Sequence, residues 1–128
     1  MNSFNAHAIH LAAGGLALVL LVGTSAPAES VEPGFKASPD VYKVVAENDQ
    51  YRVIEAKWKP GQRDKMHSHP AHLYYWVTPC TIRWYLPDGK TRDVTVESGR
   101  AGTGQPVAAH EVENLTKADC TILMFEPK

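Results

Sequence analysis

The sequence lacks both an apolar run as long as a bilayer-spanning helix and an excess of positive charge. A spanning helix needs about 20 apolar residues, whereas the longest run, residues 11–22, has 12. The 13 Lys and Arg residues are balanced by 14 Asp and Glu residues, for a formal net charge of −1. Because no basic patch or basic amphipathic segment stands out, nucleic acid and membrane surfaces are not expected partners.

The amino-terminal segment has no Lys or Arg in its first ten residues. Its apolar run is nevertheless followed by GTSAPA, in which residues 26–28 supply the small side chains of a signal-peptidase site. We therefore expect residues 1–28 to be a cleaved signal peptide, which makes the mature chain periplasmic or secreted, with no stable membrane anchor. An uncleaved anchor and a disordered leader are the alternatives, because the usual basic residues are missing.

Cysteine is scarce, since the chain has only Cys80 and Cys120. An exported chain enters an oxidising compartment, where a disulfide between them is permitted. A bridge requires their Cα atoms to lie within about 7 Å, and the sequence does not determine that separation. A disulfide and a pair of small buried side chains therefore both stay open.

Helical patterns are also lacking, because no segment has the apolar spacing of a helix of ten or more residues. Short runs rich in β-branched and aromatic residues predict strands at 41–47, 51–59, 72–77, 81–86, 91–96, 107–114 and 120–126. Residues 29–40 show no periodicity and are expected to form a flexible leader, and residues 97–106 a loop with a tight bend. Short strands at this spacing predict one all-β domain, a sandwich or barrel, over residues 41–127.

The histidines are concentrated in one stretch. Of six in the chain, four follow the expected signal peptide: His67, His69, His72 and His110. In an extended segment His67 and His69 point the same way, with Cβ atoms about 6.5–7 Å apart, so that both imidazoles can bind one ion. His72 has the opposite parity and joins them only if Pro70 introduces a bulge. His110 joins them only if its strand lies alongside.

The same residues resemble the cupin superfamily. The first cupin motif begins G-x5-H-x-H, which Gly61, His67 and His69 match at full spacing. The second motif ends H-x3-N, which His110 and Asn114 match. The hairpin expected between the two motifs also lies where cupins have it.

The resemblance covers about residues 41–127 and implies a small single-domain cupin, an all-β jelly-roll β-barrel. The stretches ENDQYRVIEAKWKPG and MHSHPAHLYYWV carry a closer likeness to the single-domain cupins named for β-alanine degradation. The resemblance also suggests a homodimer, since cupins often pair through their sheets.

The resemblance further implies one divalent transition metal ion, whether Fe, Zn, Cu, Ni or Mn, because imidazole is a ligand for all of these. Its expected ligands are His67, His69 and His110, with His72 as a fourth candidate. Simple solvated or hydrogen-bonded histidines are the alternative that the residues alone leave open.

The chain departs from the family at the carboxylate of the first motif, where Leu73 and Tyr74 stand instead. Three neutral imidazoles would leave the charge of an ion uncompensated, which favours an anionic ligand or hydroxide in an open position. Strand parity places Tyr75 and Val77 on the side of His67 and His69, where they can line the pocket; a place in the core is the alternative, and it is favoured for Val77. Parity directs no acidic residue into the pocket. No catalytic acid or base is identified.

The leading hypothesis for function is a metal-dependent, dioxygenase-like enzyme acting on a small organic molecule. The alternatives are a non-catalytic module that binds a metal ion or small ligand, and a metal-free cupin with a structural role. Whether the protein is an enzyme at all is left open by the sequence.

Overall fold

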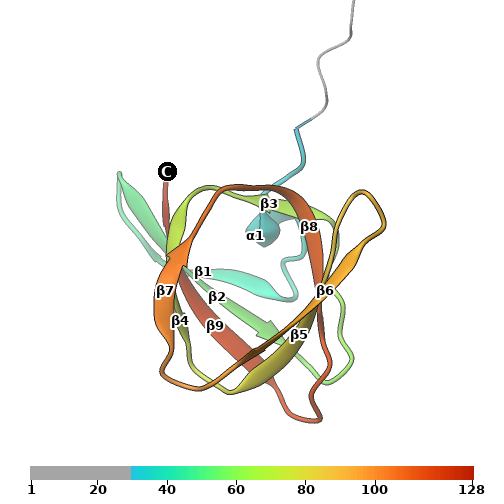
Figure 1. Ribbon diagram of the computed structural model, residues 1–128. Coiled ribbons are helices and arrows are strands. Elements are labelled where there is room, and N and C mark those ends of the chain that lie inside the picture. The colour runs from blue at the N-terminus through green and yellow to red at the C-terminus, as the bar shows by residue number, and fades with distance from the viewer. Residues whose placement is uncertain (1–29) are drawn as a thin grey trace, which may run out of the picture.

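The computed structural model describes residues 30–128 and folds them into two antiparallel sheets that face each other (Figure 1). Its elements are α1 (Gly34–Ala37), β1 (Tyr42–Glu47), β2 (Tyr51–Trp58), β3 (His67–His69), β4 (His72–Trp76), β5 (Cys80–Tyr85), β6 (Thr91–Val96), β7 (Ala101–Gly104), β8 (Val107–Asn114) and β9 (Cys120–Pro127). The strand order is β1-β2-β9-β4-β7 in one sheet and β3-β8-β5-β6 in the other. The predicted signal peptide lies outside the described residues.

The all-β prediction is confirmed, and the seven predicted strands are present. The outer strands β7 and β6 each pair on one side only, so the hydrogen-bond ladders of the described residues do not close into a continuous barrel. Two strands were not predicted. β3 is a polar run of three residues, and β7 is the Gly-rich sequence AGTG, so neither carries the apolar alternation that identifies a strand.

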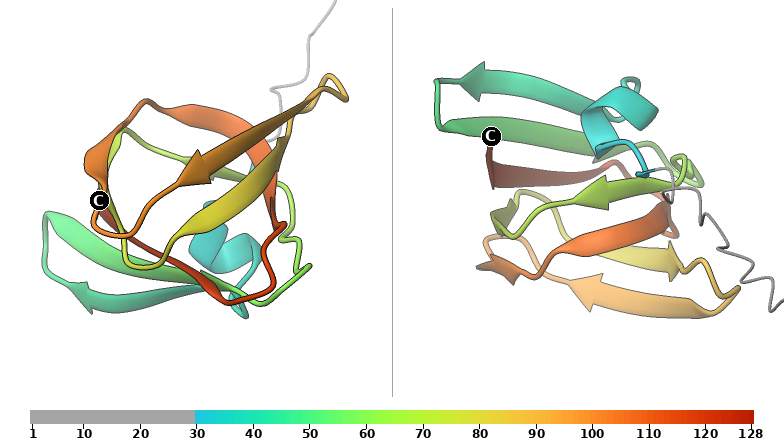
Figure 2. Two further views of the ribbon diagram at one scale, coloured as in Figure 1. Left: turned by 60° about the horizontal axis from the view of Figure 1, so that its bottom comes forward. Right: turned by 90° about the horizontal axis from the view of Figure 1, so that it is seen from above.

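Residues 30–40 were predicted to be a flexible leader, but in the structure they pack onto the sheets. Helix α1 lies beside β1 and β3 at one edge of the space between the sheets (Figure 2). The backbone N–H of Ser68 donates to the carbonyl of Glu32 (2.9 Å), and its hydroxyl donates to the carbonyl of Val31 (2.8 Å). A single helical turn has too few residues to show a period, which is why α1 was not predicted.

The core lies between the sheets and consists of inward side chains from both. Its largest members include Trp58, Trp76, Ile54 and Ile82, each at most 6% exposed. Burial of this alternating set fixes the register of the strands, because a slip of one residue would turn the apolar side chains outward. Within the described residues there is no helix that combines the length and apolar character needed to cross a membrane.

The two cysteines form a disulfide that joins β5 to β9 and so ties one sheet to the other. The Cα atoms of Cys80 and Cys120 lie 5.5 Å apart, and both residues are buried. Of the two alternatives left by the sequence, the structure therefore has the disulfide.

Removing this disulfide should destabilise the fold. A bridge across a sequence separation of 40 removes chain entropy from the unfolded state that corresponds to about 4 kcal/mol. The double variant Cys80→Ala/Cys120→Ala should lose about that much free energy of unfolding in urea titrations. Reductant should destabilise the native protein similarly and leave the double variant unchanged. A loss below about 1 kcal/mol would show that the bridge contributes little.

Candidate metal centre

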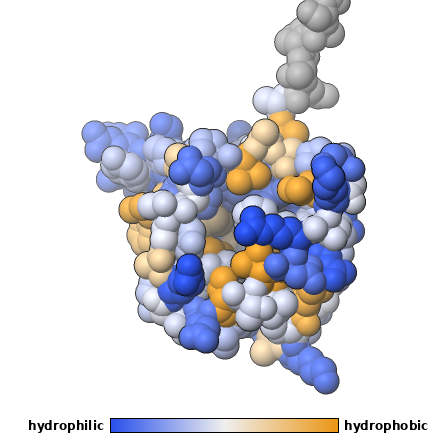
Figure 3. All heavy atoms as spheres, viewed as in Figure 1, coloured by the Kyte–Doolittle hydropathy of each residue, from blue (hydrophilic) through white to orange (hydrophobic). Residues whose placement is uncertain are grey.

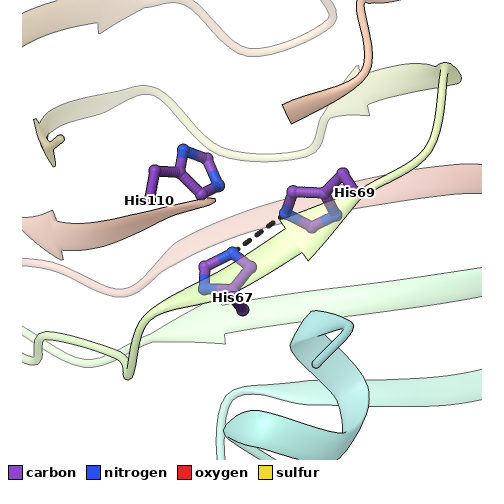
Figure 4. A group of neighbouring side chains, drawn as sticks. All are labelled: His67, His69 and His110. Carbon is purple, nitrogen blue, oxygen red and sulfur yellow. Dashed lines mark hydrogen bonds between the residues drawn. The ribbon is translucent and has the colours of Figure 1, made fainter. Parts of the chain in front are cut away.

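Three histidines from two neighbouring strands form a buried cluster. Strands β3 and β8 pair antiparallel with His67 directly opposite His110, so the strand register brings together residues far apart in the sequence. The three side chains converge in Figure 4, and their candidate ligand nitrogens all lie within 4.8 Å of one another. His67, His69 and His110 are 0%, 7% and 3% exposed. The predicted grouping of these three residues is therefore present in the structure.

Hydrogen bonds fix which nitrogen of two of these rings faces the cluster. Nδ1 of His67 donates to the carbonyl of Lys65 (2.7 Å), which can only accept, so Nε2 is the nitrogen directed towards the cluster. Nδ1 of His69 is bonded to Oε1 of Glu126 (2.8 Å). The two Nε2 atoms face each other at 2.9 Å. Two nitrogens at right angles on one ion, as in octahedral coordination with bonds of about 2.0–2.1 Å, lie about 2.9 Å apart, whereas tetrahedral zinc requires about 3.3–3.4 Å.

His110 supplies the third imidazole, and both of its ring nitrogens are buried without a hydrogen-bond partner among the described residues. An unsatisfied buried polar atom costs about 1–3 kcal/mol. The ring packs edge-on against Trp84, with centroids 4.9 Å apart, and 4.6 Å from the ring of His67. An ion between the histidines would remove the cost of a buried nitrogen that otherwise has no partner.

Burial keeps two of these imidazoles, those of His69 and His110, in the form that binds metals. It is the main reason why the pKa of His69 falls to about 3 and that of His110 to about 2, and the neighbouring histidines lower both further. Both rings are therefore neutral at physiological pH. A neutral imidazole is the ligand form of histidine.

Glu126 supplies a carboxylate that the sequence analysis missed. It is 1% exposed and follows Ile122 and Met124 on the inward side of β9. It lies behind the wall of the internal cavity and is not part of its lining, and an acidic residue in an otherwise apolar register was the available sign. Burial raises the pKa of Glu126, against the lowering effect of His72 and Arg52. Its bond to Nδ1 of a histidine orients that ring from behind.

A second buried carboxylate holds a tyrosine beside the cluster. Asp64 accepts hydrogen bonds from the hydroxyl of Tyr42 (2.8 Å), Nε1 of Trp58 (2.9 Å) and the backbone N–H of Val112 (2.7 Å). Oη of Tyr42 also lies 2.9 Å from Nε2 of His67. Burial and then Asp64 raise the pKa of Tyr42 well above its ordinary value, so the hydroxyl stays protonated.

His72, the fourth predicted ligand, lies at the edge of this cluster. Its Nδ1 donates to the carbonyl of Pro70 (2.9 Å), and its ring centroid is 5.3 Å from that of His69. The ring lies against Gly104 on β7, where an added Cβ would come within 2.4 Å of it. The group within 4.8 Å comprises only the other three histidines, so a ligand role for His72 stays a prediction.

The chain crosses from one sheet to the other between β3 and β4, and this crossing resets the strand parity. His72, Tyr74 and Trp76 consequently line the interior. Tyr75 and Val77, which were predicted to face the pocket, are 42% and 41% exposed on the outer side. A period of two cannot be carried across a change of sheet, which is why that prediction was wrong.

A cavity of about 750 Å³ lies beside the cluster, and His69, His72 and His110 form part of its wall. Its other walls are largely aromatic and aliphatic, with Trp76 and Trp84 among them. Such a volume accommodates a small organic molecule. The arrangement can therefore bring a small ligand next to two histidines of the cluster, His69 and His110.

No protein-family model matches the chain. No curated protein matches it. Among solved structures, it is similar to a cupin domain from Bordetella pertussis Tohama I, with a TM-score of 0.63, 20% identity and coverage of 69% of this chain and 92% of that one. It is also similar to a double-stranded β-helix protein from Klebsiella pneumoniae, with a TM-score of 0.52, 18% identity and coverage of 68% and 76%.

A third similar structure is the polyketide cyclase RemF from Streptomyces resistomycificus, with a TM-score of 0.52, 22% identity and coverage of 75% of this chain and 68% of that one. Identities this low show the fold alone. The chain therefore has the cupin fold, and fold and site together define a cupin-type domain with a buried three-histidine cluster beside an internal cavity.

Proton release on metal binding should reveal the lowered pKa values. At about pH 5.5, three ordinary imidazoles with a pKa near 6.5 are almost fully protonated and would release nearly three protons to an incoming ion. His69 and His110 have pKa values of about 3 and 2, so they have no proton to lose. Calorimetric Zn²⁺ titrations in buffers of different ionisation enthalpy measure the number of protons released per ion bound. That number should be about two lower than for three ordinary imidazoles. Release of nearly three would contradict the assignment.

Proposed function

We propose that the protein is an exported metal-binding cupin in which His67, His69 and His110 hold one divalent transition metal ion. The observation that carries this proposal is the ring of His110, whose two nitrogens are buried without a partner beside the facing Nε2 atoms of the other two. The sequence likeness to the β-alanine degradation type of cupin supports the same site. The three neutral donors suit Fe, Zn, Cu, Ni or Mn.

The proposed activity is a dioxygenase-like reaction on a small organic molecule that occupies the cavity. When bound, the ion would supply a Lewis acid with open positions and, for iron, copper or manganese, redox chemistry. Incorporation of both atoms of O₂ into the product needs no external reductant. The size of the cavity, about 750 Å³, and its contact with the histidines support a catalytic rather than a purely structural site.

The chain's own residues would have three tasks. Glu126 orients His69 and places negative charge behind it. Tyr42 stands protonated beside His67, and because its one hydroxyl proton is donated to the buried carboxylate of Asp64, its oxygen is held as a hydrogen-bond acceptor next to the cluster. The tryptophan walls keep bulk water from the reacting groups.

A non-catalytic binding module is the second candidate. It is favoured by one observation: none of the described residues that line the cavity is a carboxylate able to act as a general base. Export is proposed on the amino-terminal pattern and is supported by the Cys80–Cys120 disulfide, which is typical of oxidising compartments.

Substitution of single histidines should separate ligands from bystanders. The purified protein, reloaded with Zn²⁺ or Mn²⁺, should hold about one ion per chain by elemental analysis. His67→Ala and His110→Ala should lose the ion, whereas His72→Ala should keep it because its ring lies outside the compact group. Native protein without stoichiometric metal would contradict the proposal. Loss of the ion in His72→Ala as well would make His72 a fourth ligand.

Oxygen uptake should separate the two candidate functions. With iron or manganese bound, the enzyme should consume O₂ in the presence of a small-molecule substrate from a panel of acids, amines and thiols, and His110→Ala should not. An oxygen electrode and ¹⁸O₂ labelling of the product provide the measurement. Binding of metal without any O₂ uptake across the panel would favour the non-catalytic module.

A further inference from the structure

The charged side chains in the cavity wall all have the same sign. Among the described residues its only formally charged side chains are Arg92 and Arg100, and no Asp or Glu lines it. The chain as a whole has 13 basic and 14 acidic residues, so this bias belongs to the cavity and not to the average composition. A cavity wall with only positive charge attracts anions and repels cations.

The two arginines lie on the two free sheet edges that border the mouth of the cavity. Arg92 is on β6, opposite Trp84 of β5, and Arg100 immediately precedes β7, with its carbonyl bonded to the N–H of Trp76 (2.9 Å). Both arginines line the cavity and are exposed, which puts them at its opening. Figure 1 looks between β7 and β6, and Figure 3 shows this face hollowed, with strongly hydrophilic side chains next to hydrophobic ones at its edge.

Neither guanidinium is neutralised by the fold. Within residues 30–128 no carboxylate lies within 4 Å of Arg92 or Arg100, whereas Arg83, on the outer side of the same hairpin, pairs with Asp93 at 2.7 Å. A guanidinium offers a planar pair of donors that matches a carboxylate. Two guanidinium groups without a carboxylate partner, at the mouth of a largely apolar cavity, can therefore bind an anion.

From these charges, and from the aromatic wall behind them, we propose that the cavity binds a small organic monocarboxylate with an apolar body. The carboxylate is held by Arg92 and Arg100 at the mouth, and the body lies along Trp76 and Trp84. Because Trp84 also touches the ring of His110 (4.9 Å between centroids), the far end of such a ligand faces the histidine cluster. A monocarboxylate would be the substrate class of the proposed enzyme, and this catalytic role rests on the proposed function. Binding of the carboxylate itself does not depend on a metal.

Benzoate and its neutral amide, benzamide, are matched probes for this proposal. The chain's three tryptophans, Trp58, Trp76 and Trp84, all line the cavity, so their fluorescence reports occupancy. In metal-free protein at low salt, benzoate should bind about tenfold more tightly than benzamide. Arg92→Gln and Arg100→Gln should each weaken benzoate binding about three- to tenfold and leave benzamide unchanged.

Arg83→Gln is the matched control, because it removes an arginine of the same hairpin that faces away from the cavity. It should leave the affinity for both probes unchanged. Arg92→Lys keeps the charge and loses the fork, so it should retain part of the preference for benzoate. Raising the salt concentration should reduce that preference in the native protein.

The proposal is overturned if benzoate binds no more tightly than benzamide, if neither probe binds, or if the two Arg→Gln variants lose no more benzoate affinity than Arg83→Gln. Metal analysis on the same samples separates this result from the proposed function. A benzoate preference in a protein that takes up no metal would keep the anion site and reject the metal centre. Stoichiometric metal without a benzoate preference would support the metal centre and reject the anion site.

Discussion

The pairing of β3 with β8 is the constraint on which the site depends, because it sets His67 opposite His110 in a region closed to solvent. Burial of three imidazoles is unfavourable unless their nitrogens are satisfied. The fold satisfies some of them internally, through the carbonyl of Lys65 and the carboxylate of Glu126. Those contacts leave the Nε2 atoms of His67 and His69 facing each other. An ion is the simplest partner that satisfies them together with the ring of His110.

The cavity and the cluster have a common origin in the arrangement of the two sheets. After β3 the chain leaves one sheet and enters β4 of the other, which turns His72 and Tyr74 inward beside the histidines. β9 brings Glu126 to the same place from the far end of the chain. The free edges β6 and β7 leave the interior open on one side. The clustered histidines, the carboxylate that orients one of them and the cavity opening thus come from different parts of the sequence.

Much of this could be predicted from the sequence, and the remainder has physical reasons. Strand alternation was enough to predict the all-β fold, and the spacing of His67 and His69 was enough to predict that their side chains lie together. The grouping with His110 came from a family resemblance, since spacing alone does not determine which strands pair. Glu126 and the inward position of Tyr74 escaped prediction because both depend on register across the sheets, which a local period of two does not contain. Leu73 stands where the first cupin motif has a carboxylate, and its side chain is 56% exposed in the structure.

The central claim is that the three histidines bind one ion together. X-ray absorption spectroscopy of the protein loaded with a single equivalent of Zn²⁺ tests it most directly, since imidazole ligands give a characteristic scattering pattern at about 2.0–2.1 Å and beyond. Three imidazoles are expected around the ion in the native protein. Fewer than two imidazoles, or a spectrum unchanged in His110→Ala, would contradict the claim.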